Sequence, residues 1–589
     1  MNRCHTSKPL ALLRHLVSGL AAAVLCLALA GAAQAGREQR EEVTRNFDKT
    51  VPWQAGQRVC VNHRQGSIVV RAHAKNDVII HANIRVSASG RSDAEDFSKQ
   101  IEIQIEQTGA SVCVRTRYPE QNESFWNRRN ISYSVQYDLA VPENAFLEIR
   151  NSFGSVDVAG MKAGSTIVNA HGGLIFRDGR GAARLENSFG SIDLGNNAGD
   201  VDITNSNSWV NAEQVEGALI IRNRFGKVTA RKVSRGVTIR NSNGAVELDD
   251  AGGPSSVINS FGSVVIGDIR GDLSVRNENG SLEVRHVAGA ADISTTFASI
   301  VFDDIRKRVV CSGSNGRVSG SKAGEGVTIR NSFGTVELSD VGGPVEINNS
   351  NATISAYNLR GGATLKTTFG KVDASDITGN TDVTNSNGSV VLRAVSGSAS
   401  VTSSFGSIEV TKIGSGVRIV TGNSGVSATD VGGDTFIKTS FGSVRALRIN
   451  GSLTVENSNG GVQASAVKGA ASVRTSFGGV LLDDVGGAVD VDNQNGGIQL
   501  TGVSQKAGCT PITLRTSFSA IRVSLPDDAS YDVNARTSFG SVRSDLPITV
   551  LGETGSGVLT GKMGNGGCEL RLSNSNGSIE IQKAGPRRK

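Results

Sequence analysis

The chain has 589 residues, of which 38% are hydrophobic and 20% are charged, and its formal net charge is +6. Arg3, Lys8 and Arg14 supply three of these charges near the start, and Arg587 to Lys589 supply three more at the end. The body between them is therefore close to neutral and gives no electrostatic basis for binding nucleic acid. After the first 35 residues, no stretch has the roughly 18 consecutive apolar residues that span a bilayer.

Residues 1–35 have the pattern of a secretory signal peptide. A basic start is followed by an apolar run from Leu16 to Gly31 and then by the small-x-small sequence Ala33-Gln34-Ala35. This order is typical of a signal peptide with a cleavage site at Ala33 and Ala35. Cys26 does not indicate a lipoprotein, because Leu25 before it fits that signal poorly. We expect an exported chain without an integral membrane segment.

The next segment, residues 36–150, is predicted to be an N-terminal β cap domain. It carries long alternating strands, such as Ile101 to Ile105 and Tyr133 to Val141, and Asp93 to Gln100 is predicted to be a short helix. The open ends of a stacked β structure expose unpaired edges, so a cap is expected there.

Residues 151–503 are a sequence repeat, in which one aromatic residue recurs every 36 positions and asparagine usually stands halfway between. The phenylalanines are Phe153, Phe189, Phe225, Phe261, Phe297, Phe333, Phe369, Phe405, Phe441 and Phe477. The asparagines are Asn207, Asn243, Asn279, Asn315, Asn351, Asn387, Asn423, Asn459 and Asn495, and His171 takes the place of one more. A spacing held this long indicates a repeat architecture.

One 18-residue unit, from Val327 to Pro344, shows the physics of the repeat. Apolar and polar residues alternate at Val327 and Ile329 and again at Val336 and Leu338. This period of two predicts strands with one buried face. Gly and Asn in the corner between the strands tolerate positive φ. Each unit is therefore predicted to be two short strands and two turns.

Such a unit buries its apolar face only by stacking on its neighbours. We therefore predict an all-β fold, a parallel β-solenoid of about 20 coils and on the order of 95 Å. Right-handed coils are favoured, since parallel crossovers usually have that hand. A hairpin sandwich is the alternative, because Asn-Gly also occurs in hairpins, but it does not require a constant 18-residue spacing.

The length of one coil is left open by the repeat. A coil of 18 residues stacks Phe and Asn alternately in one column, large over small, which suits interdigitated packing. A coil of 36 residues stacks Phe on Phe and Asn on Asn. The shorter coil is favoured because the two half-units agree at nearly every other position.

Residues 504–589 are predicted to be a C-terminal β cap with a basic tail, because the spacing slips after Phe477. Five cysteines follow the signal peptide, and four of them lie near the ends of the exported chain. In an oxidising compartment we expect the disulfides Cys60–Cys113 and Cys509–Cys568, with Cys311 unpaired.

The recurrent phrases Asn-Ser-Phe-Gly-Ser-Val and Asn-Ser-Asn-Gly-Ser-Val resemble a bacterial β-strand-repeat family catalogued as "putative adhesins", a domain family of undefined function. The start at Val59-Cys60-Val61 and Gly66 to Val70 is similar to that family, and so are Pro526 to Gly540 and Asn574 to Ile579. The resemblance implies a β-solenoid of the cell envelope or surface and brings no catalytic residues.

No set of residues converges on a reaction, so we expect no catalytic, cofactor or metal site and no enzymatic activity. The histidines His63, His73, His81, His171 and His286 are scattered. The acidic pairs Asp249-Asp250, Asp303-Asp304 and Asp483-Asp484 each precede a turn, where Asp bonds to nearby backbone. Calcium binding and polysaccharide hydrolysis are the functional alternatives for these pairs.

The leading hypothesis is a cell-envelope or surface scaffold that adheres through repeated polar rows to an unidentified protein or glycan component. The alternative is a periplasmic scaffold that senses envelope stress or binds a ligand, first sought at Trp126 and Arg128-Arg129. The chain is expected to be periplasmic, associated with the outer surface or secreted. Solvated rows without a partner are the simplest reading of the polar positions.

Overall fold

The computed structural model describes residues 40–119, 130–503 and 509–585, which fold almost entirely into β-strands. The chain forms two compact units, Met1–Gly172 and Gly173–Lys589. In the described ranges no helix is long and apolar enough to cross a membrane. The expected cleavage residues Ala33 and Ala35 lie outside the described residues, as do Trp126, Arg128 and Arg129. The domain boundaries at residues 150 and 503 stay predictions.

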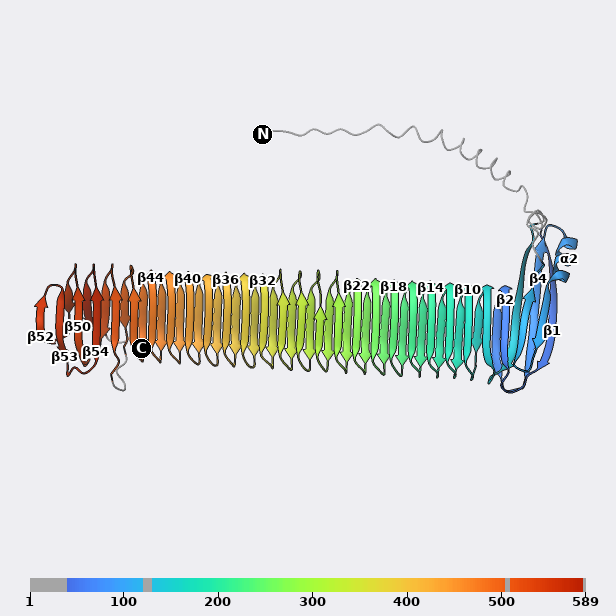
Figure 1. Cartoon of the computed structure of the whole chain (residues 1–589), viewed down its shortest axis with the longest axis horizontal. Helices are drawn as coiled ribbons and strands as arrows, with labels where there is room; N and C mark the ends of the chain where they lie inside the picture. The colour runs from blue at the N-terminus through green and yellow to red at the C-terminus, as the bar shows by residue number, and fades with distance from the viewer. Residues whose placement is uncertain (1–39, 120–129, 504–508, 586–589) are drawn as a thin grey trace, which may run out of the picture. The chain divides into compact units, whose positions relative to one another are not determined.

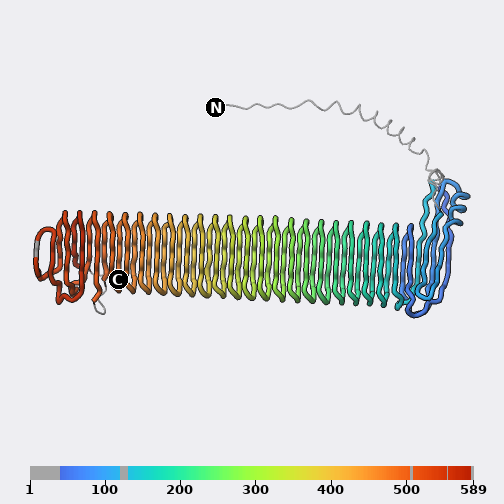
Figure 2. Tube along the Cα trace, in the orientation of Figure 1, coloured from blue at the N-terminus to red at the C-terminus, as the bar shows by residue number. Residues whose placement is uncertain are grey.

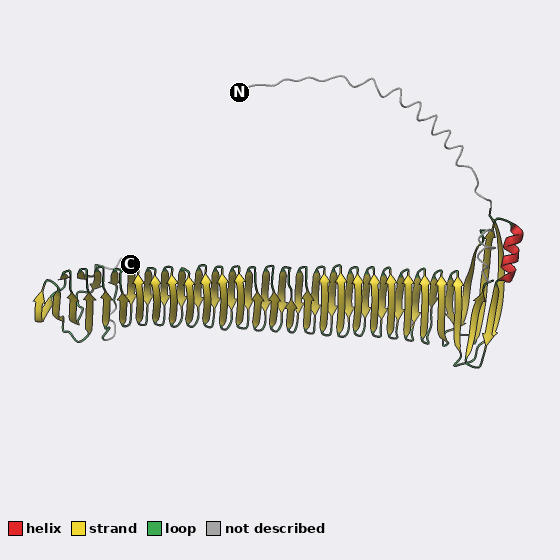
Figure 3. Ribbon diagram, turned by 45° about the horizontal axis from the view of Figure 1, so that its top comes forward, coloured by secondary structure: helices red, strands yellow, loops and turns green. Residues whose placement is uncertain are grey.

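The first unit contains a twisted antiparallel layer and the first parallel coils. Its helix α2 (Arg91–Gln100) is drawn in red in Figure 3. The helix contacts β1 and β4 and buries Ala94 and Phe97. This confirms the predicted helix. The strands are β1 (Glu41–Pro52), β2 (Arg58–Gln65), β3 (Ile68–His73), β4 (Asp77–Ala88), β5 (Glu102–Gln107), β6 (Ser111–Arg117), β7 (Ser132–Pro142), β8 (Phe146–Phe153), β9 (Val156–Ala159) and β10 (Ser165–His171).

The earliest coil of the first unit is not its outermost coil. β2 pairs in parallel with both β6 and β8, and β3 pairs in parallel with both β7 and β9. The coil made of β2 and β3 is therefore enclosed by segments that come later in the chain. The disulfide Cys60–Cys113 joins β2 to β6, which is the first of the two expected pairs.

The second unit is a stack of coils, each with one strand in each of two parallel sheets (Figures 1 and 2). The first sheet contains β11 (Leu174–Gly179), β13 (Ile192–Asn197), β15 (Val210–Val215), β17 (Val228–Val233), β19 (Val246–Ala251), β21 (Val264–Ile269), β23 (Leu282–Val287), β25 (Ile300–Ile305), β27 (Val318–Ala323), β29 (Val336–Val341), β31 (Ile354–Leu359), β33 (Val372–Ile377), β35 (Val390–Val395), β37 (Ile408–Ile413), β39 (Val426–Val431), β41 (Val444–Ile449), β43 (Val462–Val467), β45 (Val480–Val485) and β47 (Ile498–Thr501).

The second sheet contains β12 (Ala183–Phe189), β14 (Val201–Asn207), β16 (Leu219–Phe225), β18 (Val237–Asn243), β20 (Ser255–Phe261), β22 (Leu273–Asn279), β24 (Ala291–Thr295), β26 (Val309–Ser312), β28 (Val327–Asn331), β30 (Val345–Asn349), β32 (Ala363–Phe369), β34 (Thr381–Asn387), β36 (Ala399–Phe405), β38 (Val417–Asn423), β40 (Thr435–Phe441), β42 (Leu453–Asn459), β44 (Ala471–Phe477) and β46 (Val489–Asn493).

The strand register fixes the coil at 18 residues. Phe189 in β12 pairs with Asn207 in β14, and Asn207 pairs in turn with Phe225 in β16. Phe and Asn therefore alternate in one column, as the shorter coil predicts, and the 36-residue coil is wrong. The parallel pairing also confirms a solenoid over a hairpin sandwich. Handedness stays a prediction.

The core of each coil is made by the alternating apolar residues that the repeat indicates. Val327, Ile329, Val336 and Leu338 are each at most 1% exposed. Each pairs with its equivalent one coil away, for example Ile329 with Ile347. Stacking in register therefore buries continuous apolar columns, which is the main stabilising contribution in such repeats.

A column of buried asparagines runs beside the apolar columns. The first Asn of the phrases Asn-Ser-Asn-Gly and Asn-Ser-Phe-Gly points inward, as at Asn241 and Asn259, which are at most 4% exposed. Asn259 Nδ2 donates to the carbonyl oxygens of Gly244 and Gly262, both at 3.2 Å. Asn241 Nδ2 donates to Asn259 Oδ1 at 3.1 Å. The column thus satisfies corner carbonyl groups that would otherwise be buried without partners.

A bend in each first-sheet strand adds one residue between two successive inward residues, which therefore lie three positions apart and not two. Leu338 and Val341 are both buried, and Asp340 between them has φ of 57°. The equivalent residue of every regular coil lies in this left-handed region, including Asp250, Asp304 and Asp484. Asp and Asn tolerate this conformation better than most residues, which explains why the acidic pairs stand there.

The C-terminal end of the second unit encloses its last coil. β54 pairs in parallel with β48 and β50, and β55 pairs in parallel with β49 and β51. The hairpin of β52 and β53 then covers β50. Cys509–Cys568, the second expected disulfide, links the segment before β48 to the segment before β54. The strands are β48 (Ile512–Thr516), β49 (Ile521–Leu525), β50 (Tyr531–Thr537), β51 (Val542–Ser544), β52 (Ile548–Gly555), β53 (Val558–Met563), β54 (Glu569–Asn574) and β55 (Ile579–Lys583).

Candidate functional site

The repeat phenylalanines of the second unit lie outside the core, in one row along a corner of the solenoid. Each side chain is between 42% and 60% exposed. We call this set the phenylalanine row: Phe189, Phe225, Phe261, Phe297, Phe333, Phe369, Phe405, Phe441 and Phe477. The alternation of large and small residues is as expected, but the expected interdigitated packing is wrong, because the rings face solvent. A repeated exposed apolar row indicates an interaction surface.

Local geometry fixes each ring at its corner. In the phrase Asn259-Ser260-Phe261-Gly262, the inward Asn anchors the corner from inside the coil. Gly262 has φ of 112°, and a Cβ there would lie 2.5 Å from the carbonyl oxygen of Gly244 in the preceding coil. Only glycine therefore allows the backbone at position 262 to turn this close to the backbone of the preceding coil. The Phe261 side chain lies between the inward Asn259 and the tightly packed Gly262, and it projects outward from the corner.

Small polar residues separate the rings of the phenylalanine row. We call them the notch residues: Asn207, Asn243, Asn279, Asn315, Asn351, Asn387, Asn423 and Asn459. The Asn207 amide donates to the carbonyl oxygen of Ser188 at 3.1 Å, and Asn351 donates to that of Ser332 at 3.3 Å. Asn279 and Asn315 make the equivalent hydrogen bond at 3.4 Å, so these four side chains lie back along the corner. Because paired strands are about 4.8 Å apart, successive rings recur at roughly 9.6 Å with a notch between them.

Other aromatic and cationic groups stand near the rings. In the second unit, the Arg224 guanidinium lies over the Phe225 ring, 5.4 Å from its centroid. Trp209, in the coil of the notch residue Asn207, is 46% exposed. In the first unit, Phe153 is stacked on His171, which takes the Asn position of the repeat. Each unit therefore has at least one repeat phenylalanine whose ring contacts another side chain.

The outward polar rows of the sheets are exposed, as expected, and many of their charges are paired between coils. Arg222 contacts Asp202 at 2.6 Å, and Arg231 contacts Glu247 at 3.3 Å. Exposed pairs of this kind contribute little to stability. One row of the second sheet carries basic residues, such as Arg222 and its neighbour Arg240, whereas a row of the first sheet pairs Arg231 with Asp249. Because many of these charges already have a partner in a neighbouring coil, these rows are a weaker candidate than the phenylalanine row.

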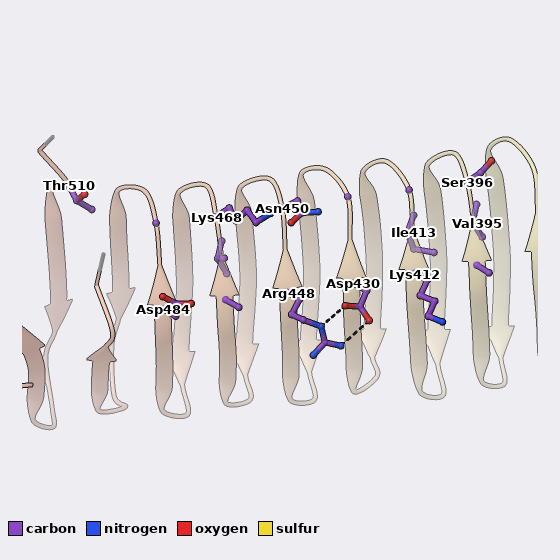
Figure 4. Close-up of a pocket in the computed structure, with 16 residues that line it drawn as sticks. Val395, Ser396, Lys412, Ile413, Asp430, Arg448, Asn450, Lys468, Asp484 and Thr510 are labelled. Carbon is purple, nitrogen blue, oxygen red and sulfur yellow. Dashed lines mark hydrogen bonds and ion pairs between the residues drawn. The ribbon is translucent and has the colours of Figure 1, made fainter. Parts of the chain in front are cut away.

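A groove of about 1020 Å³ runs along the bend column of the second unit (Figure 4). Its walls come from one bend residue per coil: Ala394, Lys412, Asp430, Arg448, Ala466 and Asp484. Its floor includes the apolar residues Val395, Ile413 and Val467. The groove follows the stacking direction, so it suits an extended molecule that crosses several coils.

One ion pair divides the groove. Arg448 donates from Nη2 to Asp430 Oδ2 at 2.9 Å, and its Nε contacts Asp430 Oδ1 (Figure 4). This hydrogen bonding holds the pKa of Asp430 below its ordinary value. The acidic pair residue Asp303, outside the groove, accepts from Ser321 Oγ at 2.5 Å, and this bond likewise lowers its pKa. These carboxylates therefore make structural contacts between coils.

The histidines are dispersed and have separate partners. His81 contacts Asp48 at 2.5 Å, His73 lies 3.6 Å from Asp77, and His286 lies 3.4 Å from Asp268. Within the described ranges, no group of three or more His, Cys, Asp or Glu residues could hold a metal ion. His63 is buried, and burial lowers its pKa to about 4. Its Nδ1 lies 3.0 Å from Thr116 Oγ1 in the interior of the first unit.

The remaining cysteine, Cys311, is unpaired and buried, as expected. Burial raises the pKa of its thiol to about 12. A thiol of such high pKa is poorly nucleophilic. Cys311 pairs with Ile293 and Ile329 in the neighbouring coils and therefore serves as a small apolar core residue.

Residues 415–582 match the model of the Toastrack DUF4097 family. This Toastrack-like stretch includes Phe441 and Phe477 of the phenylalanine row and the enclosed C-terminal coil. The predicted family resemblance is confirmed over these residues. Among curated proteins, none matches the chain.

Two crystal structures have detectable similarity. One, of a "putative cell adhesion protein" from Clostridium sporogenes ATCC 15579, is 13% identical with a TM-score of 0.17, and the match covers 38% of this chain and 99% of the other. The second, of a "putative adhesin" from Parabacteroides merdae ATCC 43184, is 11% identical with a TM-score of 0.15, and the match covers 51% and 95%.

Sequence reasoning found the phenylalanine positions but missed that the rings are exposed. It also missed the inward asparagines, although they continue an alternation that begins with apolar residues. Val327, Ile329 and Asn331 occupy every second position of one strand, and all three are buried. That continued alternation is the signal that would have placed Asn331 inside.

Proposed function

We propose that the chain is an exported, non-catalytic β-solenoid of the cell envelope or surface, and that the phenylalanine row is its adhesive contact surface. The observation that carries this proposal is the row itself, nine half-exposed rings on one corner of a rigid stack. Most exposed apolar side chains occur singly and need no explanation, whereas a long regular array does.

The chemistry of the row supports contact over catalysis. Phenylalanine has no group that transfers a proton, and the Asn amide between two rings has none that ionises near neutral pH. What the row offers is repetition. Weak contacts made by many equivalent Phe side chains add up to strong adhesion once the first contact has formed.

Export is supported by the two disulfides. Cys60–Cys113 and Cys509–Cys568 each tie one enclosed coil to its neighbour. Disulfides that hold structure persist in oxidising compartments and are rare in the cytosol. The expected signal peptide at residues 1–35 is consistent with this.

Protease treatment of intact cells, followed by immunoblotting with a periplasmic control protein, tests the location. Loss of the chain while the control survives supports a surface adhesive role. Protection from external protease together with release by osmotic shock would overturn that role.

The groove favours a second candidate, a periplasmic scaffold that binds an extended ligand. Its volume of about 1020 Å³ and its apolar floor suit such a ligand. Replacing Ala394 and Ala466 in the groove walls by Trp would fill it without touching the phenylalanine row. Loss of function in this variant, with function retained when row residues are replaced, favours the groove.

A further inference from the structure

We propose that the partner of the phenylalanine row is a second copy of the same chain, whose rings enter the notches of the first. This inference rests on the proposed function and names its partner. Two solenoids would lie side by side along their corners, and each ring of one would sit over a notch residue of the other.

The spacing of the row makes it complementary to itself. Rings recur at every second coil, roughly 9.6 Å apart, with an Asn held back against the corner between them. A copy shifted by one coil presents a ring opposite every notch. Each inserted ring would then lie about 4.8 Å from the ring on either side, within the range of stacked aromatic pairs.

The first unit shows that a ring fits in such a place. His171 occupies the notch position next to Phe153, and its imidazole is stacked on the phenyl ring. The ring centroids are 4.6 Å apart and the planes are 1° from parallel. A Phe ring from a second copy, inserted beside Phe261 or Phe333, would occupy the equivalent place.

The exposed area is that of a stable interface. Nine rings, each about half exposed and with roughly 200 Å² of side-chain surface, offer about 900 Å² per copy. Standard protein interfaces bury roughly 800 Å² on each partner. A two-fold axis perpendicular to the stack would place the same row on both sides of the interface, as closed dimers require.

The alternation itself distinguishes a second copy from other partners. A membrane surface would accept a ring at every coil and would gain nothing from polar Asn residues between rings. A linear glycan could follow the two-coil period, but stacking on sugars does not require a notch that fits a phenyl ring. Large residues opposite small ones are what interlocking of two identical rows needs.

Analytical ultracentrifugation of the purified disulfide-bonded protein tests the inference. The unaltered protein is expected to be a dimer that dissociates on dilution. In the variant F261S/F333S/F405S, each dimer loses six rings, and we expect at least ~100-fold weaker association. The control V265S/V301S removes exposed apolar residues from the first sheet and is expected to dimerise normally. Circular dichroism melts check that each variant is folded.

The variant N279F/N351F/N387F gives the sharpest distinction, because it fills three notches with rings while making the corner more apolar. Interlocking predicts that this variant, like the Ser variant, associates at least ~10-fold more weakly. Equal or stronger association would overturn the inference in favour of nonspecific apolar contact.

Two further outcomes would also overturn the inference. These are a strictly monomeric unaltered protein, and a monomer whose row binds soluble oligosaccharides, which would assign the row to a glycan. The proposed function fails separately. It is contradicted if cells carrying F261S/F333S/F405S adhere as well as unaltered cells, whether or not the purified protein dimerises.

Discussion

The imidazole of His171 lies flat against the ring of Phe153, with centroids 4.6 Å apart, because the two residues are one coil apart in the same column. In the second unit an Asn takes the place of His171 in this column, as Asn207 does beside Phe225. Two aromatic rings therefore stack when they stand on successive coils of one column, as they do in the first unit.

Replacing Asn259 by Ala is expected to destabilise the surrounding coils by about 2–3 kcal/mol, since it leaves buried corner carbonyl groups without donors. Urea denaturation of the second unit measures the loss. Asn259→Thr is the matched control, because Thr439 fills the same column and donates to the Ser424 carbonyl oxygen at 3.2 Å. An Ala variant as stable as the Thr variant would contradict a structural role for the buried amide.

Removing the disulfide with Cys509→Ser and Cys568→Ser is expected to release the enclosed C-terminal coil. The bond closes a loop with a sequence separation of 59, and such a loop contributes roughly 4 kcal/mol in the chain-entropy account. Limited proteolysis should then cut first between β48 and β55, while residues before 490 stay protected. Cleavage spread evenly over all coils would show that the end is not a separate unit of stability.

Lowering the pH is expected to destabilise the first unit through His63. Burial lowers the pKa of His63 to about 4, whereas an unfolded His has a pKa near 6.5. The unfolded chain therefore binds a proton that the folded chain does not, and stability is lost as pH falls from 6.5 to 4, by about 3 kcal/mol. Denaturation of the protein and of His63→Gln at pH 7 and pH 4 measures this. The same pH dependence in both would exclude His63 as its source.

Residues at the bend are expected to respond to substitution according to their tolerance of positive φ. Ala394 and Ala466 have φ of 54° and 55°, which costs Ala roughly 1 kcal/mol or more. Ala394→Asn and Ala466→Asn should each raise the thermal midpoint. Asn358→Ala should lower it, since it also removes a hydrogen bond to Asp340 of 2.6 Å. A lower midpoint for the Asn variants would show that the bend is not strained.

The regular part of the fold follows from the sequence because one constraint repeats. The alternation at Val327 and Ile329 determines which face is buried, and the 18-residue recurrence determines the pairing partner. The fate of Phe333 does not follow from this pattern. The alternation places Phe333, two positions after the buried Asn331, in the core, whereas its ring is 54% exposed.

The enclosed coils at both ends could not be predicted either. β2 lies between β6 and β8, and β54 lies between β48 and β50, so the pairing order departs from chain order. The local pattern of apolar and polar residues does not indicate which strands pair when the pairing order departs from the chain order. The cysteine positions were the only indication of this pairing in the sequence, because Cys60 and Cys113 must lie on neighbouring strands to form a disulfide.

The most direct test of the central claim is cell adhesion measured for four strains: one with the unaltered chain, one with F261S/F333S/F405S, one with V265S/V301S and one lacking the chain. The three strains that carry the protein are compared at equal amounts of it in the envelope. The phenylalanine row predicts that the Ser variant adheres as poorly as the strain without the chain, while V265S/V301S adheres normally. Full adhesion by the Ser variant would show that the row is not the contact surface.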